Sequence, residues 1–106
     1  MTSLTPFDLA TAGVLTFRGG ARDGADVVLT EPVTRIGRGL QADLVLENPT
    51  VSRRHAILVM RDGEVYLHDD NSLNGTWRND ERVGDGVALE DGDVIRVGDT
   101  TLRYAA

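Results

Sequence analysis

The sequence has 106 residues, the size of one ordinary domain with a single hydrophobic core. Its hydrophobic content of 41% and charged content of 26% lie near globular averages, so most of the chain is expected to fold. The net charge of -6 argues against a nucleic-acid partner, which requires a basic surface, and the absence of Cys excludes disulfides and thiol catalysis.

Residues 1–12 have no clear periodicity and include Pro6, which predicts a flexible N-terminal tail before a domain at residues 13–106. This N-terminus lacks the basic region and apolar core of a signal peptide, and no apolar run is as long as a membrane span. We therefore expect a cytoplasmic location and no membrane partner.

Short β-prone runs separated by Gly and Asp turn signals recur through the rest of the chain, and none has the period of an amphipathic helix. The runs comprise residues 14–17, 27–30, 33–36, 44–46, 56–60, 65–67, 76–77, 82–83, 87–89, 94–97 and 101–104. This pattern predicts an all-β fold, an antiparallel sandwich of two sheets. The Asp62-Gly63 pair predicts a type I′ hairpin turn that places residues 56–60 beside 65–69.

A polar cluster, Ser52 to His55, precedes the apolar run 56–60 directly. Arginine offers a planar fork of donors and serine a short directional one, so this combination suits an oxyanion. From Arg35 to Arg54 there are four Arg against two acidic residues, a local charge of +2 in an acidic protein. The sequence thus predicts a site for a small anionic group, with phosphate the obvious candidate.

Three polar loops flank the predicted strands: residues 37–39 follow one strand, 49–54 enter another and 71–76 join two more. Loops at one end of a β-sandwich can converge, so residues distant in sequence can build one site.

The motifs Gly37-Arg38, Ser52-Arg53-Arg54-His55 and Asn74-Gly75-Thr76, in this order and spacing, resemble those of the forkhead-associated (FHA) domain. The resemblance covers nearly all of the chain after the tail. It implies an FHA/SMAD-like β-sandwich of about eleven strands whose apical loops bind phosphothreonine in partner proteins, in signalling by Ser/Thr protein kinases. It implies no catalysis, no metal and no cofactor.

The same resemblance assigns roles to four residues. Arg38 would pair with the phosphate and Ser52 would donate its hydroxyl to it. Arg53 would add its amide and its guanidinium, and Asn74 would hold the peptide main chain beside the phosphothreonine.

Gly37, His55 and Gly75 resemble the family's supporting residues, with His55 bracing the loop that aims Ser52. Leu73 is a departure, because many members have Ser or Thr there that also reaches the phosphate; here that contact is absent or comes from a backbone group. Thr50 and Leu73 are further candidates for peptide contacts.

Simpler interpretations exist for the same residues. Arg38 could be a surface arginine paired with Asp43, Ser52 could cap its own loop, and Asn74-Gly75 could be only a hairpin turn.

Two other functions compete with phosphothreonine recognition. Ser52, His55 and Asp69 could form a hydrolase triad, but Ser52 lies in no Gly-x-Ser-x-Gly elbow. The chain could also be a scaffold or oligomerisation domain that binds through a sheet face without phosphate. His55 and His68 are isolated and match no zinc-site spacing.

Overall fold

The computed structural model describes residues 13–106, so the predicted tail at residues 1–12 lies outside the described residues. The described part contains eleven strands and no helix, and hence no helix able to span a membrane. The strands are β1 (Val14–Arg18), β2 (Asp26–Val28), β3 (Val33–Gly37), β4 (Leu44–Val45), β5 (Ala56–Arg61), β6 (Glu64–Asp69), β7 (Thr76–Arg78), β8 (Glu81–Arg82), β9 (Val87–Ala88), β10 (Val94–Val97) and β11 (Thr100–Ala105). The predicted all-β class is confirmed.

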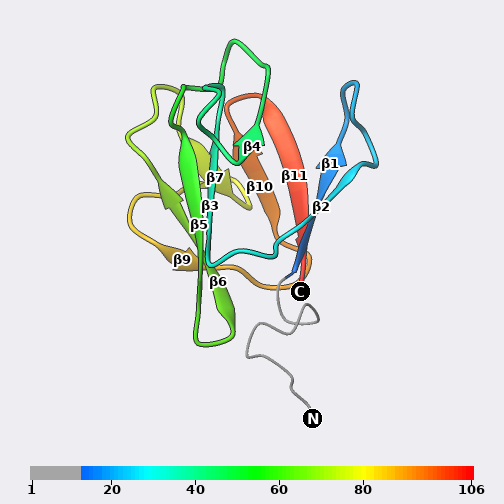
Figure 1. Cartoon of the computed structure of the whole chain (residues 1–106), viewed down its shortest axis with the longest axis vertical. Coiled ribbons are helices and arrows are strands. Elements are labelled where there is room, and N and C mark those ends of the chain that lie inside the picture. Colours follow the sequence, from blue (N-terminus) through cyan, green and yellow to red (C-terminus); the bar gives the residue numbers. More distant parts are fainter. Residues whose placement is uncertain (1–12) are drawn as a thin grey trace.

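The strands form two sheets that pack as a sandwich (Figure 1). One sheet has the order β2-β1-β11-β10-β7-β8, and the other has the order β4-β3-β5-β6-β9. All pairings are antiparallel except that of β3 with β4, which is parallel. After β3 the chain turns over through residues 38–43 and returns beside Ile36 in the same direction, so Ile36 faces Leu44.

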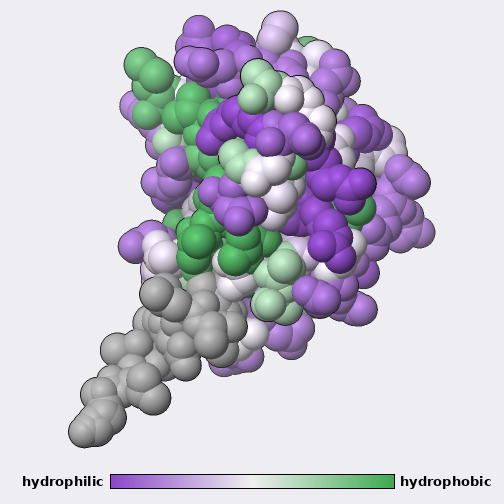
Figure 2. Space-filling view, turned by 90° about the vertical axis from the view of Figure 1, so that its right-hand side faces the viewer, coloured by the Kyte–Doolittle hydropathy of each residue, from purple (hydrophilic) through white to green (hydrophobic). Residues whose placement is uncertain are grey.

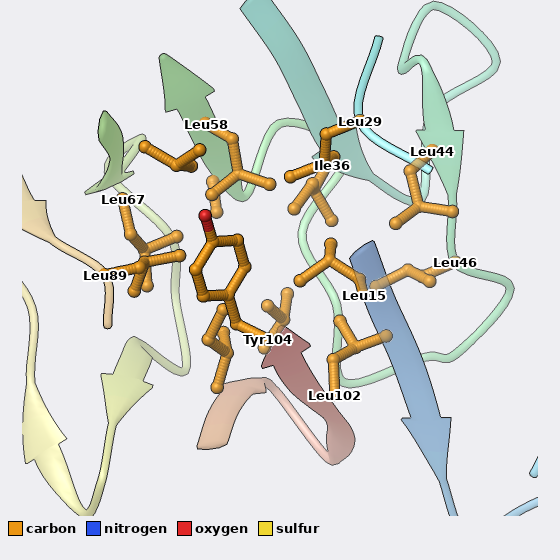
Figure 3. Close-up of a cluster of buried hydrophobic side chains, with 14 of the residues drawn as sticks. Leu15, Leu29, Ile36, Leu44, Leu46, Leu58, Leu67, Leu89, Leu102 and Tyr104 are labelled. Carbon is orange, nitrogen blue, oxygen red and sulfur yellow. The ribbon is translucent and has the colours of Figure 1, made fainter. Parts of the chain in front are cut away.

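The core lies between the sheets and follows the two-residue period of their strands. Leu15 and Leu102 point inward from one sheet, Leu58 and Leu67 from the other, and the Tyr104 ring lies between them (Figure 3). Each of these leucines is at most 2% exposed, and burying one contributes about 1.5–3 kcal/mol. The packed core makes a rigid support for the loops at the ends of the strands.

The hairpin between β5 and β6 has the predicted turn. Asp62 and Gly63 have φ angles of 55° and 80°, the two positive values that a type I′ turn requires. This turn fixes the β5–β6 register, in which Arg61 faces Glu64 and Ala56 faces Asp69. The hairpin lies at the bottom of Figure 1, so residues 55 and 70 lie at the opposite, upper end.

One predicted strand ends early. Residues 27–30 were expected to be extended, but β2 stops at Val28. Leu29 then turns into the core, where it is 2% exposed, and its amide donates to the Gly13 carbonyl at 3.0 Å.

The side of the domain seen in Figure 2, turned by 90° from Figure 1, is mostly hydrophilic, with hydrophobic residues gathered toward one edge.

Candidate functional site

Three loops meet at the end of the sandwich opposite the Asp62-Gly63 turn: residues 38–43, 46–55 and 70–75. Backbone hydrogen bonds join them. The Arg38 amide donates to the Ser52 carbonyl at 2.9 Å, and the Asp70 amide donates to the His55 carbonyl at 2.8 Å. The convergence expected from the sequence is therefore present, and the three motifs share one region.

Gly37 allows the first two loops to approach each other closely. A Cβ atom at this position would overlap the Arg53 carbonyl oxygen and would lie 3.1 Å from the Ser52 carbonyl oxygen. Only glycine leaves room for this close approach of the Arg53 backbone.

Arg38 is exposed and is held in place through one of its five N–H groups. Its Nε donates to the Val51 carbonyl at 2.9 Å, and within residues 13–106 its four terminal N–H groups have no acceptor, so they can meet a ligand. The Asp43 carboxylate accepts from the Arg35 backbone amide at 2.8 Å, and among residues 13–106 it makes no ion pair with Arg38. The alternative Arg38–Asp43 surface pair is thus wrong.

Ser52 is half-buried, and its hydroxyl is oriented by another loop. The Leu73 amide donates to Ser52 Oγ at 3.0 Å, so the hydroxyl oxygen is an acceptor there and its proton remains available to donate outward. Ser52 therefore links the second and third loops rather than capping its own loop.

His55 is fully buried, and both of its ring nitrogens bind backbone groups. The Ser52 amide donates to Nδ1 at 2.9 Å, which places the ring proton on Nε2, and Nε2 donates to the Gly75 carbonyl at 2.8 Å. One imidazole thus ties the Ser52 loop to the Asn74-Gly75 loop. Because neither nitrogen faces the Ser52 hydroxyl, the hydrolase triad is not formed.

Asp69, the third member of that triad, organises the β6–β7 loop. It accepts from the Thr76 hydroxyl at 2.7 Å and from the amide and hydroxyl of Ser72, whose oxygen in turn accepts from the Gly75 amide at 3.0 Å. Partial burial raises the pKa of Asp69, but the hydrogen bonds from Ser72 and Thr76 outweigh it and hold that pKa below its usual value. Sequence reasoning missed this network.

Asn74 is exposed and is anchored to Thr50. Its Nδ2 donates to the Thr50 carbonyl at 2.8 Å, and its side-chain oxygen accepts no hydrogen bond from the described part of the chain. The Thr50 hydroxyl donates to Asn48 Oδ1 at 2.7 Å and accepts from the Asp99 amide at 2.8 Å. The carbonyl and the hydroxyl of Thr50 are therefore both hydrogen-bonded within the domain, and the carbonyl holds Asn74.

Gly98 completes this support and was not identified from the sequence. A Cβ atom at Gly98 would lie 2.6 Å from the Thr50 carbonyl oxygen, and its φ angle is 57°. For the turn around Thr50, the sequence did contain a local signal, Asn48-Pro49-Thr50. The Asn48 side chain accepts from the Thr50 amide at 2.9 Å, as in an Asx turn.

The remaining predicted residues project from the loops. Arg53 is exposed, and among residues 13–106 neither its amide nor its guanidinium donates to a protein acceptor. Arg54 makes an ion pair of 3.3 Å with Asp70, although its side chain is 82% exposed. Leu73 is 85% exposed. Gly75 is buried, with a φ angle of 90° that glycine adopts without strain.

The family model of the FHA domain matches residues 34–98. An oxoglutarate dehydrogenase inhibitor from Corynebacterium diphtheriae is 40% identical over 90% of this chain and 66% of its own length. The glycogen accumulation regulator GarA from Mycolicibacterium smegmatis is 38% identical over 88% of this chain and 58% of its own length. The chain therefore spans only part of these relatives.

A similar solved structure comes from a structural and functional analysis of phosphothreonine-dependent FHA domain interactions. It superposes with a TM-score of 0.80 at 35% sequence identity, and the match covers 89% of this chain and 95% of that one.

Proposed function

This chain belongs to the FHA domain family, and from that premise we propose that it binds threonine-phosphorylated segments of partner proteins through Arg38, Ser52, Arg53 and Asn74. One observation carries the proposal. The donors of Arg38 and Ser52 lie on two loops joined directly by the Arg38 amide–Ser52 carbonyl bond of 2.9 Å, and no acidic side chain within residues 13–106 is paired with either.

Each residue has a distinct part in this proposal. Arg38 presents a guanidinium fork that suits two phosphate oxygens, and the Ser52 hydroxyl donates to the phosphate from its fixed position. The Arg53 amide adds a backbone donor. Asn74, fixed by Thr50, uses its free side-chain oxygen on a peptide amide, and Leu73 offers an apolar contact to the segment.

The setting of this activity is also a proposal. We take residues 13–106 as the binding unit, preceded by a tail at residues 1–12. Phosphothreonine as the ligand connects the domain to a Ser/Thr protein kinase, and we place it in the cytoplasm. The names of its relatives, an inhibitor of a dehydrogenase and a regulator of glycogen accumulation, support a regulatory rather than a catalytic part.

Calorimetry with one peptide in two forms, with and without phosphate on its threonine, tests the proposal. We expect micromolar affinity, about -8 kcal/mol, for the phosphorylated form only. Arg38→Ala should weaken it about ten- to hundredfold, because a charge-assisted hydrogen bond contributes about 1.5–3 kcal/mol.

Arg61→Ala, an exposed arginine at the far end of β5, is the matched control and should bind like the wild type. A loss of less than about threefold for Arg38→Ala, or equal binding of both peptide forms, would favour a phosphate-independent scaffold instead.

A further inference from the structure

A hollow of about 630 Å³ lies beside the proposed phosphate site, and its lining includes four arginines. It shares Arg38 and Arg53 with that site but includes neither Ser52 nor Asn74, so it adjoins the site rather than forming it. Arg35 from β3 and Arg54 are the other two arginines of its lining. Its volume is within the range of pockets that hold small ligands or side chains.

The charge of this hollow is opposite to that of the molecule. Four of the eleven Arg of the chain face it, whereas the net charge of the whole chain is -6. The one acidic residue in its lining is Asp70, whose carboxylate already pairs with Arg54 at 3.3 Å. Asp43 lies nearby but binds the Arg35 backbone amide, not its guanidinium.

Two of these arginines have guanidinium groups that are unpaired within the described residues. Among residues 13–106 the guanidiniums of Arg35 and Arg53 make no hydrogen bond or ion pair. Leu40 and Ala42 supply apolar groups to the lining of the same hollow. The Leu40 side chain is 93% exposed. The hollow therefore combines unpaired cations with an apolar wall.

We propose that this hollow binds an acidic side chain that flanks the phosphothreonine in the same bound segment. Its glutamate or aspartate carboxylate is held by Arg35 and by the terminal N–H groups of Arg54, whose Nε alone pairs with Asp70. This inference rests on the proposed function and extends it to the sequence of the partner. Leu40 and Ala42 contact the aliphatic part of that side chain, while its carboxylate meets the guanidiniums. Because the hollow lies on one side of Arg38, the acidic residue lies on one flank of the phosphothreonine only.

The test uses four versions of one phosphothreonine peptide: alanine on both flanks, glutamate on the N-terminal flank, glutamate on the C-terminal flank, and a second phosphothreonine in place of the favourable glutamate. Affinities are measured for the wild type, for the double variant Arg35→Gln/Arg54→Gln and for the control Arg61→Gln. Arg61 is exposed on the same strand as Ala56 but lies at the other end of it.

For the wild type and Arg61→Gln we expect glutamate on one flank to raise affinity about three- to twentyfold over the alanine-flanked peptide, the scale of one or two partly exposed ion pairs. In the double variant this gain should disappear, while affinity for the alanine-flanked peptide changes less than about twofold. Higher salt should reduce the gain.

Several results would overturn the inference. These are no gain on either flank, an equal gain on both flanks, a gain that survives in the double variant, or a gain with the second phosphate but none with glutamate. In each of these cases the alanine-flanked phosphopeptide still binds, and the proposed function stands. Failure of the wild type to bind even that peptide would instead remove the proposed function, and the inference with it.

Discussion

At the scale of single residues, the site depends on a few atoms that hold loop backbone in place. His55 is the clearest case, because its two ring nitrogens satisfy the Ser52 amide and the Gly75 carbonyl in a fully buried position. A buried polar group left without its partner costs about 1–3 kcal/mol, so this imidazole supports two loops at once.

We expect His55→Ala to lower the free energy of unfolding by about 2–5 kcal/mol, because it leaves two backbone groups unsatisfied and opens a cavity. Urea denaturation measures this loss. Phosphopeptide binding should weaken only through a less ordered Ser52 loop. His68→Ala, a half-buried residue on β6, should cost less. Unchanged stability together with lost binding would make His55 a direct ligand instead.

Gly37 gives a second test at the residue scale. Gly37→Ala places a methyl group against the Arg53 carbonyl, so we expect a loss of about 1–3 kcal/mol in unfolding free energy and weaker phosphopeptide binding. Gly84→Ala is the matched control, since a Cβ there meets nothing within 4 Å. If the two variants have equal melting temperatures, the close contact at Gly37 is not important.

At the scale of elements, the β6–β7 loop is held by carboxylate chemistry. Asp69 binds Ser72 and Thr76, and Asp93 in a similar way accepts from the Glu90 amide, Asn79 and Arg78. Partial burial raises the pKa of Asp93, but these hydrogen bonds and the Arg78 charge outweigh burial and hold that pKa below its usual value.

These pKa values predict how stability depends on pH. A carboxylate whose pKa is lower in the folded than in the unfolded state stabilises the fold fully above the unfolded value, 3.8 here. This contribution is lost as the pH falls through the lower folded value. We therefore expect the urea midpoint to be nearly constant well above pH 3.8 and to fall below it, and Asp69→Asn to flatten that fall. The same acid profile in Asp69→Asn and wild type would contradict the assignment.

Most elements could be predicted from the sequence because their signals are local. The Asp62-Gly63 turn and the apolar run at residues 56–60 predict a hairpin by themselves, and both are present. The parallel β3–β4 pair has no such signal, because it joins only two residues on each strand after a loop. The early end of β2 depends on Leu29 contacting Gly13, which no local pattern shows.

In the whole molecule, the sandwich brings segments that are distant in sequence to one end. Contacts between such segments are the part of the site that the sequence could not predict. The motif residues Arg38, Ser52 and Asn74 could be placed together by resemblance. The support of Thr50 by Asp99 could not, since it joins residues 49 positions apart and depends on how the two sheets pack. The basic hollow likewise could not be predicted, because the fold is what brings Arg35 and Arg54 to the lining of one hollow.

Under the proposed function, the three apical loops together bind a phosphorylated threonine. The most direct measurement is a titration of isotope-labelled protein with the alanine-flanked phosphothreonine peptide, followed by amide chemical shifts. We predict saturable shifts for the amides of Arg38, Ser52, Arg53 and Asn74, none for the turn at residues 62–63, and no shifts with the unphosphorylated peptide. Shifts that concentrate on a sheet face, or that are the same with and without phosphate, would contradict the account.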